Sequence, residues 1–300
     1  MFLANLINYG LILLKRGSMK KNKNKLVVPV LKWVGGKRQL LSEIKKYIPK
    51  YTTYYEPFVG GGAVLFELQP SKAVINDMNS ELINVYNVIK NNIDELIEEL
   101  SIEKKYINTS ECFYNIRKLD RNTKQYNKLT GIQKAARILY LNKTCYNGLY
   151  RVNSMGAFNS PFGNYKNPNI INAITLRAVS KYFNDSDITF LTGDFEKAVK
   201  GIKKGSFVYF DPPYVPISKT SNFTGYNENG FGESEQRRLK KLCDTLSKKG
   251  VNILVSNSDC EFIRDLYNNY DIIEIKAKRF INCNSDGRGE VSEVLIRNKC

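Results

Sequence analysis

Short apolar runs alternate with amphipathic segments along most of the chain. The apolar runs have the length and the β-branched and aromatic composition of buried strands, and they are Ala73–Ile75, Ile188–Leu191, Ser206–Phe210, Val251–Val255, Asp271–Ala277 and Val291–Ile296. Between them, apolar residues recur at helical spacing in segments that include Asn79–Lys90, Ile93–Leu100 and Ser234–Lys248. Strands that alternate with helices predict a doubly wound α/β sheet with helices on both faces.

The alternation lapses in the middle of the chain. This stretch holds two predicted helices, Glu111–Lys118 and Gly131–Asn142, followed by a long loop at Asn153–Asn169. We therefore expect a mostly helical domain inserted between two parts of the α/β domain. The predicted bounds are residues 102–173 for the insertion and residues 26–101 and 174–300 for the α/β domain.

The long loop interleaves aromatic residues with Asn and basic residues. Its rings are Phe158, Phe162 and Tyr165, while Lys166 lies within it and Arg151 just precedes it. Arg and Asn read base edges in DNA, and aromatic rings stack on bases, so this composition suits a nucleic-acid surface. An ordinary long structural loop explains the same composition equally well.

One predicted strand leads directly into Asp211-Pro212-Pro213-Tyr214. Proline lacks the N–H that a sheet ladder needs, so the strand Ser206–Phe210 ends here and the chain leaves the sheet at Asp211. A carboxylate and an aromatic ring are thus carried out of the carboxyl edge of the sheet, where ligands bind in open α/β folds. Taken alone, the motif fits a proline turn with a capping Asp and a packing Tyr about as well.

Other carboxylates follow other predicted strands at the same edge. The strand Tyr54-Tyr55-Glu56 runs into the turn Gly60-Gly61-Gly62, the next strand ends at Asn76-Asp77, and Asp194 follows a third. Acids at such strand tips bind ribose hydroxyls in doubly wound folds. The turn has neither the G-x-G-x-x-G spacing nor a Walker ending, so a nucleoside-like cofactor without phosphates fits it better than a dinucleotide.

The only tryptophan of the chain lies just before a second glycine turn. Trp33 precedes Gly35-Gly36 and the basic pair Lys37-Arg38, and the predicted helix that follows has Leu40, Leu41, Ile44 and Ile48 on one face. Trp33 could cover an apolar or aromatic ligand, and Lys37 could pair with an anionic group. From this segment alone, a helix-entry turn with a core tryptophan is the favoured interpretation.

Composition narrows the chemistry. Lys and Arg number 46 against 29 acids, a formal net charge of +17, which favours a polyanionic partner but also occurs in ordinary Lys-rich proteins. The chain has no His, which excludes His-based nucleophilic triads and His-ligated metals, and we expect no metal centre. The six cysteines form no C-x-x-C pair, as in a cytoplasmic protein with reduced thiols.

The N-terminal residues carry no targeting pattern. The apolar run Phe2–Leu14 precedes Lys15-Arg16, the reverse of a signal peptide, and it is too short to span a bilayer. We interpret residues 1–25 as an N-terminal extension and basic arm, and we expect no membrane segment.

Five motifs together resemble the Dam-type adenine-N6 DNA methyltransferases, in particular the restriction-system members that recognise GATC. They are Lys32-Trp33-x-Gly35-Gly36-Lys37, Glu56-Pro57-Phe58-x-Gly60-Gly61-Gly62, Asn76-Asp77, Tyr146-Asn147-Gly148-Leu149-x-Arg151 and Asp211-Pro212-Pro213-Tyr214. The resemblance runs from about Lys32 to Ile296, in the family's order. It implies a Rossmann-like sheet that binds S-adenosylmethionine, a DNA target-recognition domain at residues 102–173, double-stranded DNA as substrate, and a cognate restriction endonuclease that acts separately.

The resemblance also implies roles for individual residues. The implied cofactor-binding positions are Trp33, Lys37, Glu56, Phe58, Gly60, Asp77, Asp194, Phe195 and Asp211, with Asp77 at the ribose and Asp194 and Phe195 beside the adenine. The implied DNA contacts are Tyr146, Asn147, Leu149 and Arg151, together with either Lys25 or Lys32. The implied catalytic positions are Asp211, Pro212 and Tyr214.

These residue types suit methylation of an exocyclic amine. The lone pair of the adenine amine is delocalised into the ring, so the nitrogen is a poor nucleophile until Asp211 and the Pro212 carbonyl accept its two N–H groups. Tyr214 can stack on the base once it has left the helix. A cytosine-N4 methyltransferase, an enzyme acting on RNA or a protein amide, and a non-catalytic DNA-binding module of the same fold are the alternatives.

Overall fold

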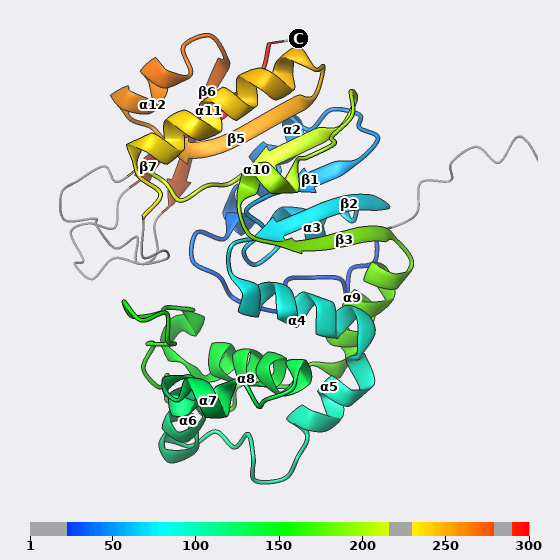
Figure 1. The fold of residues 1–300 in the computed structure, drawn as a ribbon, viewed down its shortest axis with the longest axis vertical. Helices are drawn as coiled ribbons and strands as arrows, with labels where there is room; N and C mark the ends of the chain where they lie inside the picture. The colour runs from blue at the N-terminus through cyan, green and yellow to red at the C-terminus, as the bar shows by residue number, and fades with distance from the viewer. Residues whose placement is uncertain (1–22, 216–229, 279–289, 300) are drawn as a thin grey trace, which may run out of the picture.

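The structure is a computed structural model, and it describes residues 23–215, 230–278 and 290–299. Within these residues, seven strands form one sheet in the order β3-β2-β1-β4-β5-β7-β6 (Figure 1). The strands are β1 Tyr54–Glu56, β2 Lys72–Asp77, β3 Asp187–Thr192, β4 Phe207–Phe210, β5 Asn252–Ser258, β6 Asp271–Lys278 and β7 Glu290–Arg297. All the predicted strands are confirmed, and their ends move by at most three residues. Nearly all of the extension predicted at residues 1–25 lies outside the described residues.

The order of the strands places a topological switch point at the middle of the sheet. Strand β1 pairs in parallel with β2 on one side and with β4 on the other. The chain order therefore reverses between β1 and β4, and ligands of doubly wound folds bind at the carboxyl ends of the strands that flank such a reversal. Strand β7 is antiparallel to both β5 and β6.

Strand β4 is buried on both faces, which explains its uninterrupted apolar sequence. Phe207 and Tyr209 join the apolar cluster on one side of the sheet, whereas Val208 and Phe210 join the cluster on the other. Burying each large apolar side chain is worth about 1.5–3 kcal/mol, so this short strand is a strongly held platform for the residues that follow it.

Helices cover both faces of the sheet, as predicted. Helices α3, α4 and α9 contribute to the first cluster, and α10, α11 and α12 lie over the second (Figure 1). The helices are α2 Leu41–Lys46, α3 Ala63–Leu68, α4 Ser80–Asn91, α5 Ile93–Leu100, α6 Ser110–Arg117, α7 Thr123–Tyr126, α8 Gly131–Thr144, α9 Ala173–Asn184, α10 Phe195–Ala198, α11 Glu233–Lys248 and α12 Glu261–Leu266, with 3-10 turns η1 Lys37–Gln39, η2 Lys118–Arg121 and η3 Tyr146–Gly148. None of the described helices is long and apolar enough to cross a membrane.

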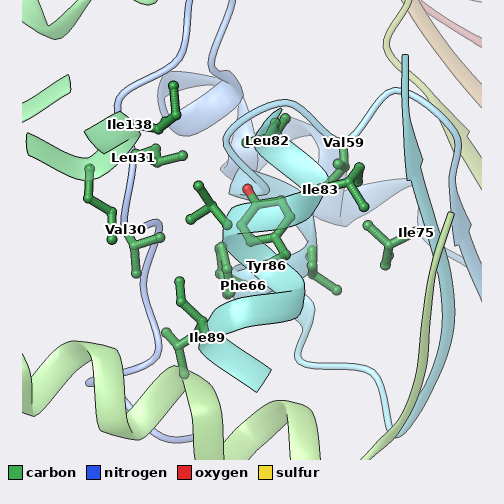
Figure 2. Close-up of a cluster of buried hydrophobic side chains, with 14 of the residues drawn as sticks. Val30, Leu31, Val59, Phe66, Ile75, Leu82, Ile83, Tyr86, Ile89 and Ile138 are labelled. Atoms are coloured by element: carbon green, nitrogen blue, oxygen red, sulfur yellow. The ribbon is translucent and has the colours of Figure 1, made fainter. Parts of the chain in front are cut away.

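Helix α4 joins the sheet to the helices of the middle stretch. Figure 2 shows its side chains Leu82, Ile83, Tyr86 and Ile89 packed among residues of the sheet, of the N-terminal segment and of α8. The Asn79 side chain caps the helix by accepting a hydrogen bond from the Leu82 N–H at 3.0 Å. One amphipathic helix thus ties the two parts of the molecule into a single core.

The middle stretch is built around α8. Most of this helix is buried, and it begins with a capping box formed by Thr130 and Gln133. It packs against α4, α5 and α6 (Figure 1). One expectation about helices was wrong, because the helix after Trp33 ends at Lys46, before Ile48. The helices α7, α9 and α10 were not predicted.

Candidate active site

Four carboxylates lie at the carboxyl ends of adjacent parallel strands, as the sequence predicted. Glu56 ends β1, Asp77 ends β2, Asp194 follows β3 and Asp211 follows β4. The buried Asn76 side chain connects these strand ends, because its Nδ2 donates to the carbonyls of both Pro57 and Gly193 at 2.9 Å. The predicted acidic edge therefore exists, and it surrounds the switch point between β1 and β4.

The glycine turn is fixed by polar groups on both sides. The carboxylate of Asp77 accepts hydrogen bonds from the N–H groups of Gly60 and Asn79, each at 2.9 Å. Burial raises the pKa of Asp77, and these backbone donors oppose that rise. From the other side, the Tyr86 hydroxyl donates to the Gly60 carbonyl at 2.7 Å. The turn is thus a preformed backbone surface rather than a loose loop.

Trp33 lies directly on this turn. A Cβ at Gly60 would come within 2.8 Å of Trp33 Cδ1, and one at Gly61 within 3.0 Å of Trp33 Cβ. Gly60 also has a φ of +48°, which residues with a Cβ rarely adopt. Glycine is therefore required here by backbone conformation and by the close approach of the indole. The sequence predicted both parts of this pair but not their contact.

Asp211 is held by a buried cation. The Nζ of Lys37 lies 2.8 Å from Asp211 Oδ1, and their side chains are 8% and 19% exposed. The same ammonium donates to the Gly35 carbonyl at 2.7 Å and lies 4.5 Å from the centre of the Tyr214 ring. Two residues from distant motifs, Lys37 and Asp211, thus meet in one site.

A second donor fixes the same carboxylate oxygen. Ser256 Oγ donates to Asp211 Oδ1 at 2.7 Å, and the Tyr209 hydroxyl lies 3.1 Å from Ser256 Oγ. Among the described residues, Asp211 Oδ2 accepts no hydrogen bond and pairs with no cation. The carboxylate is therefore oriented through one oxygen, and the other is available to a ligand.

Glu56 is buried beside this pair. Its carboxyl is 2% exposed and accepts a hydrogen bond from the Tyr54 hydroxyl at 2.9 Å. Burial raises the pKa of Glu56 well above its usual range, and the nearby charge of Asp211 adds to the rise. The protein therefore favours the protonated form of Glu56, and a cationic ligand at this edge would favour its ionised form.

The Asp211–Tyr214 loop is clamped by residues that the sequence analysis did not assign to the site. Gln236 Nε2 donates to the Pro213 carbonyl at 2.9 Å, and Asn257 Nδ2 donates to Gln236 Oε1 at 3.0 Å. Asn257 Oδ1 accepts from the Val215 N–H at 3.3 Å. Gln236 and Asn257 are fully buried. The Pro213 carbonyl thus accepts a hydrogen bond, whereas the Pro212 carbonyl accepts none from the described residues.

Tyr214 is anchored at its hydroxyl. The Tyr214 hydroxyl donates to Glu293 Oε2 at 2.7 Å, which ties the loop to strand β7. Together with the Lys37 ammonium near its ring, this contact leaves Tyr214 half-buried. The ring is therefore held in place by contacts at its hydroxyl and at its face.

Asp194 and Phe195 begin helix α10. Asp194 caps the helix by accepting from the Glu196 N–H at 2.9 Å, and its other oxygen is ion-paired with Arg238. The Arg238 guanidinium lies 4.3 Å from the centre of the Phe195 ring, and the centre of the Phe58 ring lies 5.3 Å from it. The structure thus brings the predicted residues Phe58, Asp194 and Phe195 together and adds Arg238, which sequence reasoning missed.

The motif residues of the middle stretch form a hairpin. Cys145 bridges Phe162 and Val152 bridges Phe158, with Tyr146–Gly148 in a 3-10 turn. Tyr146, Asn147 and Arg151 are exposed, and Tyr146 is 57% exposed. An exposed ring and an exposed guanidinium on one hairpin form a surface that a nucleic acid could meet.

Lys32 lies against this hairpin. The Asn142 side chain accepts from the Lys32 N–H at 2.9 Å and donates to the carbonyls of Lys32 and Gly148. A Cβ at Gly148 would collide with the Lys32 side chain at 2.4 Å. Burial lowers the pKa of the neighbouring Lys143, and the cations Lys32 and Arg38 lower it further. Cationic groups therefore gather beside the hairpin.

The donor set suits one kind of cofactor. The site offers carboxylates, aromatic rings and a glycine turn on which Trp33 lies. Such a set matches a cationic, nucleoside-like molecule without phosphates. No group of three or more Cys, Asp or Glu side chains in the described ranges is placed to hold a metal ion.

Comparison with known proteins gives consistent results. Residues 33–281 match the family described as D12 class N6 adenine-specific DNA methyltransferase. The chain is 45% identical to the Type II methyltransferase M1.LlaDCHI of Lactococcus lactis subsp. cremoris, over 93% of this chain and 98% of that protein. It is 43% identical to the Type II methyltransferase M.MjaIII of Methanocaldococcus jannaschii, over 91% and 99% of the two chains. It is 35% identical to the DNA adenine methylase of Escherichia coli strain K12, over 92% and 95%.

Proposed function

The chain belongs to the D12 class of N6 adenine-specific DNA methyltransferases, and we propose that it methylates N6 of an adenine within GATC, in the cytoplasm, with S-adenosylmethionine as methyl donor. A member of this class acts on double-stranded DNA.

The single observation that carries the proposal is the geometry of Asp211. This carboxylate stands at the switch point with one oxygen fixed by Lys37 and Ser256. Its other oxygen and the Pro212 carbonyl can each accept one N–H of an exocyclic amine. Two acceptors pull the nitrogen towards tetrahedral geometry, which frees its lone pair and stabilises the positive charge that develops there.

The residues around the glycine turn would hold the cofactor. When bound, S-adenosylmethionine supplies an electrophilic methyl group on a sulfonium. Trp33 and the Gly60 turn form one wall, Asp77 and Glu56 supply carboxylates, and Phe58, Phe195 and Asp194 form the far end. Ligand hydroxyls would compete with backbone N–H groups for Asp77, which already accepts two of them.

The hairpin of the middle stretch is the proposed DNA-reading element. We assign residues 102–173 to target recognition, residues 26–101 and 174–300 to cofactor binding and catalysis, and Tyr146, Asn147, Leu149 and Arg151 to base contacts. Of the two candidate N-terminal lysines, Lys32 is supported by its packing against Gly148. The net charge of +17 supports phosphate binding around this surface.

The adenine must leave the helix to reach Asp211. Unstacking costs about a few kcal/mol, and stacking on an aromatic ring returns about 1–3 kcal/mol. Tyr214 is the ring proposed for this contact, and its bond to Glu293 means that little side-chain entropy is lost on stacking. The likeness to Type II methyltransferases also supports a restriction endonuclease that acts separately on the same site.

A methylation assay on matched duplexes tests the proposal. Duplexes that contain one GATC, and scrambled duplexes of equal composition, are incubated with labelled cofactor, and the nucleosides are then analysed by mass spectrometry. We expect N6-methyladenine in the GATC duplex alone, with affinity that falls steeply as salt rises. N4-methylcytosine, or equal labelling of both duplexes, would each refute it.

A further inference from the structure

Tyr150 joins the cofactor side of the site to the DNA-reading hairpin. It stands between two proposed base-contacting residues, Leu149 and Arg151, yet its own side chain is only 4% exposed. Its ring stacks on Trp33, with centroids 4.7 Å apart and planes inclined by 19°. Trp33 in turn lies on the Gly60 turn. One aromatic contact therefore connects the two surfaces.

Tyr150 also contacts the helix that follows Asp77. Burial raises the pKa of Tyr150 to about 12, and a hydrogen bond with the Asn79 side chain opposes that rise. Asn79 donates its N–H to the Asp77 carboxylate and caps helix α4. The hydroxyl and the ring of Tyr150 thus meet two separate parts of the proposed cofactor pocket.

On the hairpin side, Tyr150 packs against the second arm of the hairpin, around Phe158. Its ring meets Phe158 edge to face, with centroids 5.5 Å apart. The N–H of Phe158 donates to Asp120 at 2.7 Å, and its carbonyl accepts from Arg121 at 2.7 Å. Asp120 is itself ion-paired with the buried Arg137. This arm of the hairpin is therefore firmly anchored, and the Tyr150 ring lies in contact with both Phe158 and Trp33.

Tyr150 shares its backbone with the two proposed base-contacting residues on either side of it. Tyr150 is buried, whereas its neighbours Leu149 and Arg151 are half-buried and exposed, which is the alternation that extended chain gives. Leu149 has extended backbone angles, and Arg151 is exposed. Any restriction of the Tyr150 ring is thus passed to the two reading residues through the backbone that they share.

We propose that Tyr150 is a positioning residue that couples cofactor binding to recognition of the DNA sequence. A cofactor that lies against Trp33 and the glycine turn restricts the indole, and the stacked Tyr150 ring shares that restriction. The reading residues then lose less freedom when DNA binds, so each ligand tightens the other by the same factor. The inference rests on the proposed function, which assigns Trp33 to the cofactor and Leu149 and Arg151 to DNA.

Measuring that factor tests the inference. The dissociation constant of S-adenosylhomocysteine is measured alone and with saturating GATC duplex, and that of the duplex with and without S-adenosylhomocysteine. For the unchanged protein we expect reciprocal tightening of about 5- to 150-fold, the usual range for coupled sites. Tyr150→Leu should bring the factor close to one, whereas Tyr150→Phe, which keeps the ring, should retain most of it.

Tyr114→Leu is the matched control, because Tyr114 is exposed on α6 of the same stretch and stacks on no residue of the cofactor pocket among its described contacts. It should leave the factor unchanged. An unchanged factor in Tyr150→Leu would overturn the inference even if both ligands bound more weakly, as would the absence of coupling in an active, unchanged protein. Thermal unfolding checks that each variant is folded. Failure of the proposed function itself would show separately, as absence of methyl transfer by the unchanged protein.

Discussion

The ammonium of Lys37 lies 2.8 Å from Oδ1 of Asp211, and both side chains are largely buried. A buried ion pair contributes little net stability, but it leaves a costly unpaired charge when one partner is removed. Here the pair also aims the carboxylate, since its second oxygen stays open. The contact therefore links the stability of the site to its proposed chemistry.

Replacing Asp211 separates these two roles. Asp211→Ala should abolish methyl transfer while DNA binding persists, because the amine loses its acceptor. It should also lower the free energy of unfolding by about 3–5 kcal/mol, because Lys37 is left buried without its partner. Labelled methyl transfer, duplex binding and urea unfolding measure the three effects. The double variant Lys37→Met with Asp211→Ala should recover much of the stability but none of the activity, and turnover in either variant would contradict the assignment.

Glu56 predicts a dependence of stability on pH. Burial raises the pKa of Glu56. The folded chain therefore keeps the Glu56 carboxyl proton at pH values where the unfolded chain, in which the pKa of Glu is about 4.3, has lost it. The contribution of Glu56 to the free energy of unfolding therefore falls as pH rises above that value. Glu56→Gln removes the ionisation and still accepts the Tyr54 hydrogen bond, so it should be more stable than the unchanged protein near neutral pH. The difference should shrink towards about pH 4, as measured by urea unfolding.

Glu67 supplies the opposite control for that experiment. A hydrogen bond from Lys45 lowers the pKa of Glu67, so its ionised form stabilises the folded chain. Glu67→Gln should therefore be slightly less stable near neutral pH, and its deficit should vanish on acidification. A Glu56→Gln variant that followed the Glu67→Gln pattern would mean that Glu56 is ionised in the folded protein.

The clamp on the Asp211–Tyr214 loop predicts a loss of rate rather than of binding. Gln236→Leu leaves the Pro213 carbonyl and the Asn257 amide without their partner, so the loop can shift. We expect kcat to fall about 10- to 100-fold, while KM for cofactor and DNA changes little. The exposed neighbour Arg237, which pairs with Glu233 on the same helix, gives the control Arg237→Ala with unchanged kcat. A variant that altered KM alone would argue against a positioning role.

The strands and the acidic edge were predictable because their signals are local. The apolar run before Asp211 and the two prolines after it predict a central strand that ends just before Asp211, and β4 confirms this strand. The side chains of Ser256 and Asn257 reach the Asp211–Tyr214 loop because β5 lies next to β4. These contacts could not be predicted, because the order of strands is not encoded in any single segment.

Contacts between distant segments escaped prediction for the same reason. From its own segment Trp33 was interpreted as a core residue that could also cover a ligand, and its stacking on Tyr150 requires the N-terminal segment and the hairpin to meet. Asp194 was recognised at its strand tip, whereas its partner Arg238 comes from α11. Helix α9 was not predicted, although the Asn172 side chain caps it. Asn172 continues a loop that is rich in Asn, so its capping role could not be told apart from the loop composition.

Arg151 gives the sharpest test of DNA reading. It is exposed on the hairpin, and among the described residues its guanidinium makes no ion pair, so it is available to pair with a guanine. A bidentate contact is worth about 1–3 kcal/mol, so Arg151→Ala should relax preference at one base pair by that amount and leave the others unchanged. The measurement is kcat/KM on duplexes that carry each single substitution in GATC. Lys166→Ala, a basic change in the adjoining exposed loop, should instead weaken binding to all duplexes alike, as a phosphate contact does. Uniform loss in Arg151→Ala would make Arg151 a phosphate contact as well.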